Sequence, residues 1–316
     1  MDAPPALRSR ASIALAAGAG LVCGWFVTDR IVFRAFERRI AFEDAVLMGT
    51  AEPPYRFRLL WPALGRLGER VVALGIDSRH WQHCLAFGAM TIAVLVATTV
   101  LFHALLHRLF APATALVGTL LLALAVPLSV TGYWVEDDFF TLLAFVAGMA
   151  LLVRGRDAWL PPLVAVAALN REQAVFLAVL HAIFAATRTQ RRWLPVLASF
   201  AAWGVTFAVV RWSVGAAPTR FTVGRHLAEN ADAYHLLRTT LPLWIAQFGV
   251  VAALAIASYR TSDRFFRCAL LSLVPYIAAF AAFGDLWETA KFLPALVVLL
   301  PMAMQTLTAE RARLPA

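Results

Sequence analysis

The chain has 316 residues, of which 61% are hydrophobic and 15% are charged, and its mean hydropathy is +0.73. Soluble domains are about half apolar and a quarter charged, so this composition excludes a water-soluble protein. The net charge of +9 would indicate nucleic-acid binding in a soluble protein. Here the basic residues cluster between apolar segments and act as topology signals and headgroup contacts, so no nucleic-acid partner is expected.

Apolar runs of about 17 residues or more recur along the chain, each long enough to cross a hydrocarbon layer of roughly 30 Å. The first follows a short basic segment like a signal peptide, but no convincing small-x-small cleavage site precedes Asp29, so we interpret it as a retained helix. We expect an all-α bundle with one transmembrane domain, residues 1–316. Its eight full spans are expected near 11–27, 81–105, 113–132, 139–153, 193–211, 240–258, 266–283 and 292–307.

Residues 28–80 are expected to form a first periplasmic loop that lies on the membrane. The segment carries nine arginines, which the positive-inside rule disfavours on that side. Its apolar residues recur at helical spacing, which predicts two interfacial helices whose arginines reach lipid headgroups. The two stripes are Val32, Phe33, Phe36 and Ile40, then Leu60, Ala63, Leu64, Leu67, Val71 and Leu74.

This loop contains an acidic pair, Glu43-Asp44, ahead of a proline turn and the aromatic-interleaved segment Tyr55-Arg56-Phe57-Arg58. Two interpretations of Asp44 follow from the spacing. It forms a salt bridge with a nearby arginine, or it removes a proton from a hydroxyl. In the second case the low polarity of the membrane interface would raise the pKa of the carboxylate.

A second acidic group, Glu136-Asp137-Asp138, stands at the outer end of one span and the start of the next. Adjacent carboxylates repel one another, which can raise a pKa or recruit a divalent cation. Acidic residues also cap helix N-termini, where the helix dipole favours them, and this is the alternative for Asp138.

The stretch 159–186 is apolar at both ends and interrupted at Asn170-Arg171-Glu172-Gln173. A single straight helix would place a charged pair at mid-membrane. Arginines at both ends of the stretch indicate that both ends are cytoplasmic. We therefore expect two half-length helices that form a hairpin with these four residues at its outer turn, where Arg171 and Glu172 either serve a site or form an internal ion pair.

Two further outer segments carry candidate binding residues. The loop 212–239 holds Arg220, Arg225 and His226, which could bind phosphate, unless it is simply a solvated loop with scattered charge. Glu288 precedes Lys291, the only lysine in the chain. Cys23, Cys84 and Cys268 lie in apolar segments without CxxC spacing and predict no metal site. There is no glycine-rich phosphate loop, HExxH or GxSxG pattern.

The order of these segments resembles the bacterial polytopic glycosyltransferases of the GT-C type, which take sugars from polyprenyl-phosphate carriers. The resemblance rests on Asp44 followed by Pro54-Tyr55-Arg56-Phe57-Arg58-Leu59-Leu60-Trp61-Pro62, on Asp137 or Asp138, on Leu169-Asn170-Arg171-Glu172, and on Glu288 before Pro294 and Pro301. It covers most of the chain. Where such proteins often have Glu followed closely by Arg, this sequence has Lys291, and it lacks the large C-terminal outer domain of many of them.

The resemblance implies an inverting hexosyl or pentosyl transferase of the bacterial inner membrane with its active face in the periplasm. Asp44 is the implied catalytic carboxylate, with Glu43 as the alternative. Arg171, with Lys291 or an arginine of the 212–239 loop, would stabilise the phosphate leaving group. The implied partners are a polyprenyl-phosphate sugar and membrane lipid. A divalent cation is a possible cofactor. The rival interpretations are a transporter or flippase, which should show paired broken helices, and a structural membrane subunit.

Overall fold

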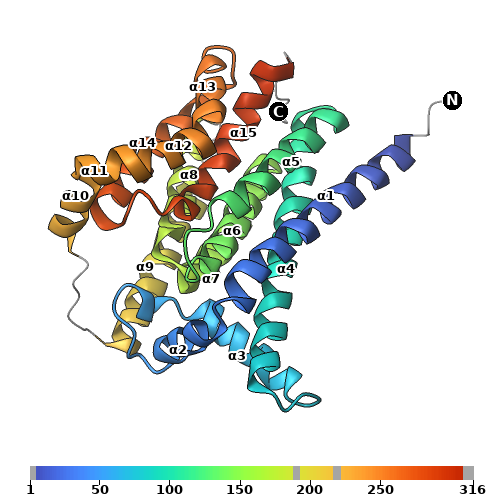
Figure 1. Ribbon diagram of the computed structural model, residues 1–316. Helices are drawn as coiled ribbons and strands as arrows, with labels where there is room; N and C mark the ends of the chain where they lie inside the picture. Colours follow the sequence, from blue (N-terminus) through green and yellow to red (C-terminus); the bar gives the residue numbers. More distant parts are fainter. Residues whose placement is uncertain (1–4, 188–192, 216–221, 309–316) are drawn as a thin grey trace.

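The computed structural model describes residues 5–187, 193–215 and 222–308 and shows an all-helical bundle, with no strand in these ranges (Figure 1). The first helices are α1 (Pro5–Thr28), α2 (Phe36–Leu47), α3 (Leu60–Val72), α4 (Arg79–Leu109), α5 (Pro112–Leu128) and α6 (Glu136–Val153). They are followed by α7 (Leu160–Asn170), α8 (Val175–Thr187), α9 (Trp193–Val214), α10 (Val223–Ala231) and α11 (Ala233–His235). The last are α12 (Leu241–Trp244), α13 (Val250–Ala257), α14 (Arg264–Phe283) and α15 (Leu293–Thr308).

Six helical segments of the described chain are long and apolar enough to cross a membrane, and they indicate a membrane protein. They are Arg10–Phe33, Arg79–Leu109, Trp193–Val214, Ala233–Ala257, Arg264–Phe283 and Thr289–Thr308. Each matches one expected span. The other two expected spans fall on α5, which has only 17 residues, and on α6, whose first turn holds three acids. The expected count of eight is therefore not established.

The bundle is built around α15, the last helix that the structure describes. In the apolar 18-residue stretch within Thr289–Thr308, 89% of the residues are buried. Helix α15 contacts α5, α6, α13 and α14. By contrast, only 17% of the corresponding apolar stretch of α9 is buried. Its exposed side chains include Leu194, Leu197 and Val205. An apolar helix with an uncovered apolar face is what a lipid-facing position requires.

Helices α1 and α4 pack closely because glycine removes a side chain from their contact. A Cβ at Gly20 would lie 2.3 Å from Thr99 Oγ1 and 2.7 Å from Val96 Cα. Small residues allow such backbone approach between membrane helices, where close packing rather than the hydrophobic effect holds helices together. Any larger residue at position 20 would push the two helices apart.

Helices α2 and α3 lie at one end of the bundle, away from the start of α1 and the end of α15 (Figure 1). A helix is present over the second expected stripe as α3, and the stripe residues Leu67, Val71 and Leu74 are exposed. The opposite face of α3, including Trp61 and Glu69, is buried. The helix therefore turns apolar residues outward and a carboxylate inward, which suits a membrane surface.

The first interfacial helix differs from the expectation. Val32 and Phe33 belong to a π-helical turn, Asp29–Phe33, that continues α1, and α2 begins only at Phe36. Val32 is fully buried in a small cluster that includes Trp61 and Phe87. The apolar spacing across 32–40 was correct, but one part of it faces the protein interior rather than lipid.

The expected reversal at Asn170–Gln173 is present. Asn170 contacts Thr141 near the start of α6, while the Cβ position of Gly148 lies near both Leu163 of α7 and Leu177 of α8. Helix α7 therefore runs antiparallel to α6, and α8 runs back along it. The charged turn sits at the end of the bundle where α6 begins.

Candidate functional site

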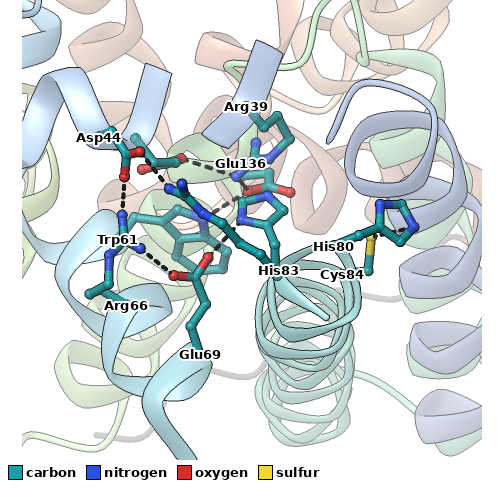
Figure 2. A network of polar contacts seen from close by, with 11 residues as sticks. Arg39, Asp44, Trp61, Arg66, Glu69, His80, His83, Cys84 and Glu136 are labelled. Carbon is teal, nitrogen blue, oxygen red and sulfur yellow. Dashed lines mark hydrogen bonds and ion pairs between the residues drawn. The ribbon is translucent and has the colours of Figure 1, made fainter. Parts of the chain in front are cut away.

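The first turn of α6 holds three consecutive acids, and each is paired with an arginine from a different segment. Glu136 forms an ion pair with Arg39 of α2, whose guanidinium also donates to Glu43 Oε1 at 3.0 Å and to the carbonyl of Tyr133 at 2.7 Å. Trp61 Nε1 donates to Glu136 Oε2 at 2.8 Å. Figure 2 shows Arg39 and Trp61 converging on Glu136. These contacts fix α2 and the start of α3 against α6.

The next two acids pair with the proline-turn segment and the hairpin. Arg58 Nη1 donates to Asp137 Oδ2 at 3.0 Å. Arg171 forms an ion pair with Asp138 and lies 3.5 Å from Asp137 Oδ2 through Nε. Asn170 Nδ2 donates to the carbonyl of Asp137 at 2.7 Å. The first turn of α6 thus joins the segment around Arg58 to the tip of the hairpin.

The start of α6 shows how the acidic group is placed on the helix. The helix begins at Glu136, and Val135 at its N-cap position makes no side-chain capping bond. Asp138 is in the first turn, where the helix dipole favours a carboxylate, but its partner is Arg171. Since each carboxylate has its own arginine, their mutual repulsion is offset by buried cations.

At the hairpin tip, Arg171 and Glu172 point to different partners. Arg171 has extended backbone angles, φ −155° and ψ 145°, which turn adjacent side chains to opposite sides. Glu172 Oε1 accepts from Arg211 of α9 at 3.2 Å, and Trp203 Nε1 donates to the Glu172 carbonyl at 2.9 Å. The alternative of an Arg171–Glu172 ion pair is therefore not the arrangement found.

The late carboxylate, Glu288, forms an ion pair with Lys291, and both residues are buried. Trp134 Nε1 donates to Glu288 Oε1 at 2.9 Å, which ties this loop to the segment before α6. Arg58 and Arg171 lie within electrostatic range of both Glu288 and Lys291. The structure therefore brings Lys291 and the hairpin tip to one region, although nearly 120 positions separate them in sequence.

A cavity of about 20 Å³ lies within this charged cluster, lined on one side by Glu43, Tyr55, Arg58 and Asp137. That volume holds a water molecule at most, so no sugar fits in this conformation. Burial raises the pKa of Glu43 to about 8. Arg39 opposes this rise, but its charge is shared with Glu136. Burial likewise raises the pKa of Tyr55 to about 12.

Asp44 faces away from this cluster and lines a separate, open pocket of about 790 Å³. Its carboxylate forms an ion pair with Arg66 and accepts from Arg79 Nη2 at 2.6 Å. The pocket is otherwise lined by Arg70, by part of α3 and by the end of α2, namely Leu47, Met48, Ala63 and Leu67. The salt-bridge interpretation of Asp44 is thus correct in geometry, and the carboxylate is also accessible.

Arg66 links Asp44 to Glu69, as Figure 2 shows. Its Nη1 donates to Glu69 Oε2 at 2.7 Å, and Glu69 Oε1 lies 2.8 Å from His83 Nδ1 on α4. Sequence reasoning missed the pocket residues Arg66, Arg70 and Arg79. The spacing of four between Arg66 and Arg70 on an expected helix was the available signal, because it places both on one face.

The remaining candidates lie apart from both places. Arg56 donates to the carbonyl of Val214 at 2.9 Å and so holds the end of α9. Arg225 pairs with Glu229, and His226 Nδ1 lies 2.8 Å from Asp285 Oδ1. Arg220 lies outside the described residues.

Comparison of the chain with models of known protein families, with curated proteins and with solved structures gives no match.

Proposed function

We propose that the protein is a membrane glycosyltransferase that moves a sugar from a polyprenyl-phosphate carrier to an acceptor hydroxyl in the Asp44 pocket. The observation that carries this proposal is the composition of the pocket. One carboxylate stands among Arg66, Arg70 and Arg79, and the open volume of about 790 Å³ falls in the range of ligand pockets. Exposed apolar side chains of α3 adjoin it and offer a surface for a lipid tail.

The reaction that these groups support is a single displacement with inversion. The acceptor oxygen forms a bond to the anomeric carbon while its proton passes to the Asp44 carboxylate. The bond between that carbon and the phosphate oxygen breaks, and the lipid phosphate leaves with the electron pair. Guanidinium groups hold a phosphate through two oxygens at once, so Arg66, Arg70 and Arg79 suit the developing negative charge.

The closed cluster around the first turn of α6 has a different role in this proposal. Arg171 is buried, and the cavity in this cluster holds no more than a water molecule, whereas the arginines around Asp44 line an open pocket. We therefore assign phosphate binding to the arginines of the pocket. The cluster positions α2, which carries Asp44, through Arg39 and Glu136.

The proposal includes the finer topology expected from charge placement: eight full spans, a half-length hairpin formed by α7 and α8, and a cytoplasmic N-terminus. The Asp44 pocket then faces the periplasm of a bacterial cell. What supports this is the location of α2, α3 and the hairpin tip at one end of the bundle, opposite the start of α1 (Figure 1).

The experiment is a transfer assay with purified protein and radiolabelled polyprenyl-phosphate sugars, following release of the lipid phosphate. We expect Asp44→Asn to abolish release and Arg70→Gln to reduce it about ten- to a hundredfold, the loss expected for roughly 1.5–3 kcal/mol of charge-assisted hydrogen bonding. Arg34→Gln is the matched control, because Arg34 is an exposed arginine of the same loop outside the pocket.

Three outcomes would redirect the assignment. Loss of activity in Glu43→Gln with full activity in Asp44→Asn would move the base to the closed cavity. Equal activity in Arg70→Gln and Arg34→Gln would remove the pocket from the donor site. Transbilayer movement of the lipid sugar without bond cleavage would identify a flippase instead.

A further inference from the structure

The loop after α14 and the helix α10 bring three potential metal ligands together outside the Asp44 pocket. His226 and Glu229 are three positions apart on α10, so their side chains share one face of that helix. Asp285 follows α14. One ligand atom from each of these residues lies within 4.8 Å of the other two.

The backbone around these residues is held firmly, so the grouping does not depend on chance side-chain positions. Asn230 Nδ2 donates to the carbonyl of Ala281 at 3.0 Å and to that of Gly284 at 2.8 Å. The backbone N–H of Leu286 donates to Asn230 Oδ1 at 2.9 Å. One asparagine thereby docks α10 onto both sides of Asp285.

We propose that His226, Glu229 and Asp285 bind a divalent transition-metal ion such as Zn²⁺ or Mn²⁺. An imidazole with two carboxylates is a donor set that such ions accept, and the fourth position would hold water. The proposal does not depend on the transferase assignment, because none of the three residues lines the Asp44 pocket.

Of the three ligands, His226 and Asp285 need only a small adjustment, while the Glu229 oxygen, which lies within 4.8 Å of them, would move closer. His226 Nδ1 and Asp285 Oδ1 are 2.8 Å apart, which is a hydrogen-bond distance. Two ligands about 2.0–2.2 Å from a tetrahedral ion lie roughly 3.3 Å apart, so the pair would open by about half an ångström. The ion would replace the hydrogen bond between the imidazole and the carboxylate.

The ion would brace the last outer loop. Asp285 stands three positions before Glu288, and Trp244 Nε1 donates to the carbonyl of Leu286 between them at 2.8 Å. A metal that joins α10 to Asp285 would therefore restrain the segment leading to the Glu288–Lys291 pair. We expect bound metal to raise the melting temperature of the protein, since it binds only the folded form.

Arg225 distinguishes a metal site from a simple ion-pair network. Its Nε is 2.6 Å from Glu229 Oε1, and it therefore competes with a metal for that carboxylate. Replacing Arg225 by Gln should strengthen metal binding by up to about fivefold, because an exposed ion pair competes only weakly for the carboxylate. If Arg225, His226, Glu229 and Asp285 form only an ion-pair network, the Arg225→Gln variant should bind no metal.

The test uses full-length protein purified in detergent with a histidine-free affinity tag and stripped with chelator. Zn²⁺ and Mn²⁺ are titrated by calorimetry, and Co²⁺ by its visible absorption bands. We expect one equivalent to bind. His226→Ala or Asp285→Asn should weaken binding by more than the roughly 10- to 100-fold lost when a residue that only hydrogen-bonds to a metal ligand is replaced. His235→Ala is the matched control, because His235 is a histidine of the same outer loop outside the trio.

Glu229→Gln supplies a variant with little risk of misfolding, since this side chain is partly exposed. Equal binding in the wild type, His226→Ala and Glu229→Gln would overturn the proposal, as would the absence of any binding to the wild type.

Discussion

Arg171 and Asp138 form a buried ion pair that joins the tip of the α7–α8 hairpin to the first turn of α6. The pair is nearly inaccessible to water, since the two side chains are 3% and 2% exposed. Two desolvated charges stabilise a fold only as long as both are present. The pair therefore fixes the hairpin tip against α6.

Removing one partner should be strongly destabilising. We expect Arg171→Ala to lower the free energy of unfolding by about 3–5 kcal/mol, because Asp138 would remain buried without its cation. Denaturation in detergent, followed by tryptophan fluorescence, measures this loss. The double variant Arg171→Gln with Asp138→Asn should recover part of it, since no uncompensated charge remains.

Arg34→Ala is the control for that measurement, because Arg34 forms an exposed pair with Asp29 and should contribute at most about 1 kcal/mol. A loss in Arg171→Ala no greater than that in Arg34→Ala would show that the buried pair does not hold the hairpin.

The hairpin itself was predictable from sequence, but the partner of Arg171 was not. Arginines at both ends of the stretch and polar residues in its middle indicated two short helices. Nothing in a one-dimensional pattern says that Arg171 is extended and therefore points away from Glu172. Only the packing of α7 on α6 brings Asp138 within reach.

The raised pKa of Glu43 predicts that the stability of the protein depends on pH. Burial raises its pKa from the ordinary value of 4.5 to about 8, so the folded protein binds this proton more tightly than the unfolded chain. Where the folded state binds more protons, stability falls as pH rises. The contribution of Glu43 should thus be greatest below about pH 4.5 and decline between 4.5 and 8, by roughly 1 kcal/mol per pH unit.

The measurement compares unfolding of the wild type and Glu43→Gln across that range. We expect the stability of the wild type relative to the variant to decrease steadily as pH increases to about 8, because glutamine cannot ionise. A difference that increases with pH would mean that Arg39 dominates and keeps the pKa of Glu43 low.

The choice between Glu43 and Asp44 illustrates the limit of the sequence for the site. Adjacent residues on a helix point about 100° apart, so Glu43 and Asp44 can lie in different surroundings. Which one faces inward depends on how α2 lies on α6, and that is set by Arg39 and Glu136. The sequence identified both acids but could not orient them.

Gly65 predicts a steric effect at the contact between α3 and α4. A Cβ at this position would lie 2.0 Å from Phe87 Cζ, so Gly65→Ala forces α3 away from α4. Overpacking of this kind costs about 1–3 kcal/mol, measured by the free energy of unfolding. Phe87→Leu in the same chain should restore part of the loss by making room.

Gly204 of α9 provides the control. Apart from the backbone of α9 itself, no atom of the described residues lies within 4 Å of its Cβ position, so Gly204→Ala should be neutral or stabilising by about 0.5–1 kcal/mol through the higher helix propensity of alanine. Destabilisation of both variants to the same extent would mean that the Phe87 contact is not responsible.

Topology gives the sharpest check on the proposed arrangement, because the α7–α8 hairpin determines how many times the chain crosses. If α7 and α8 form a hairpin, Asp77 and Asp232 lie on the same, periplasmic side, and Arg156 and Arg260 lie on the cytoplasmic side. If α7 and α8 together make one crossing, Asp232 changes sides and joins Arg156.

These four positions suit labelling, because all are exposed, whereas Gln173 at the hairpin tip is buried and would react poorly even on the correct side. Single cysteines are introduced into a chain whose native Cys23, Cys84 and Cys268 are replaced by alanine, and intact cells are treated with a membrane-impermeant thiol reagent. We expect positions 77 and 232 to label directly and positions 156 and 260 only after permeabilisation.

Labelling of 77 but not of 232 in intact cells would establish a single crossing. The Glu288–Lys291 loop would then lie on the opposite side from Asp77, although Trp134, Arg58 and the hairpin tip bring these segments to one end of the bundle, and the proposed membrane orientation would have to be abandoned.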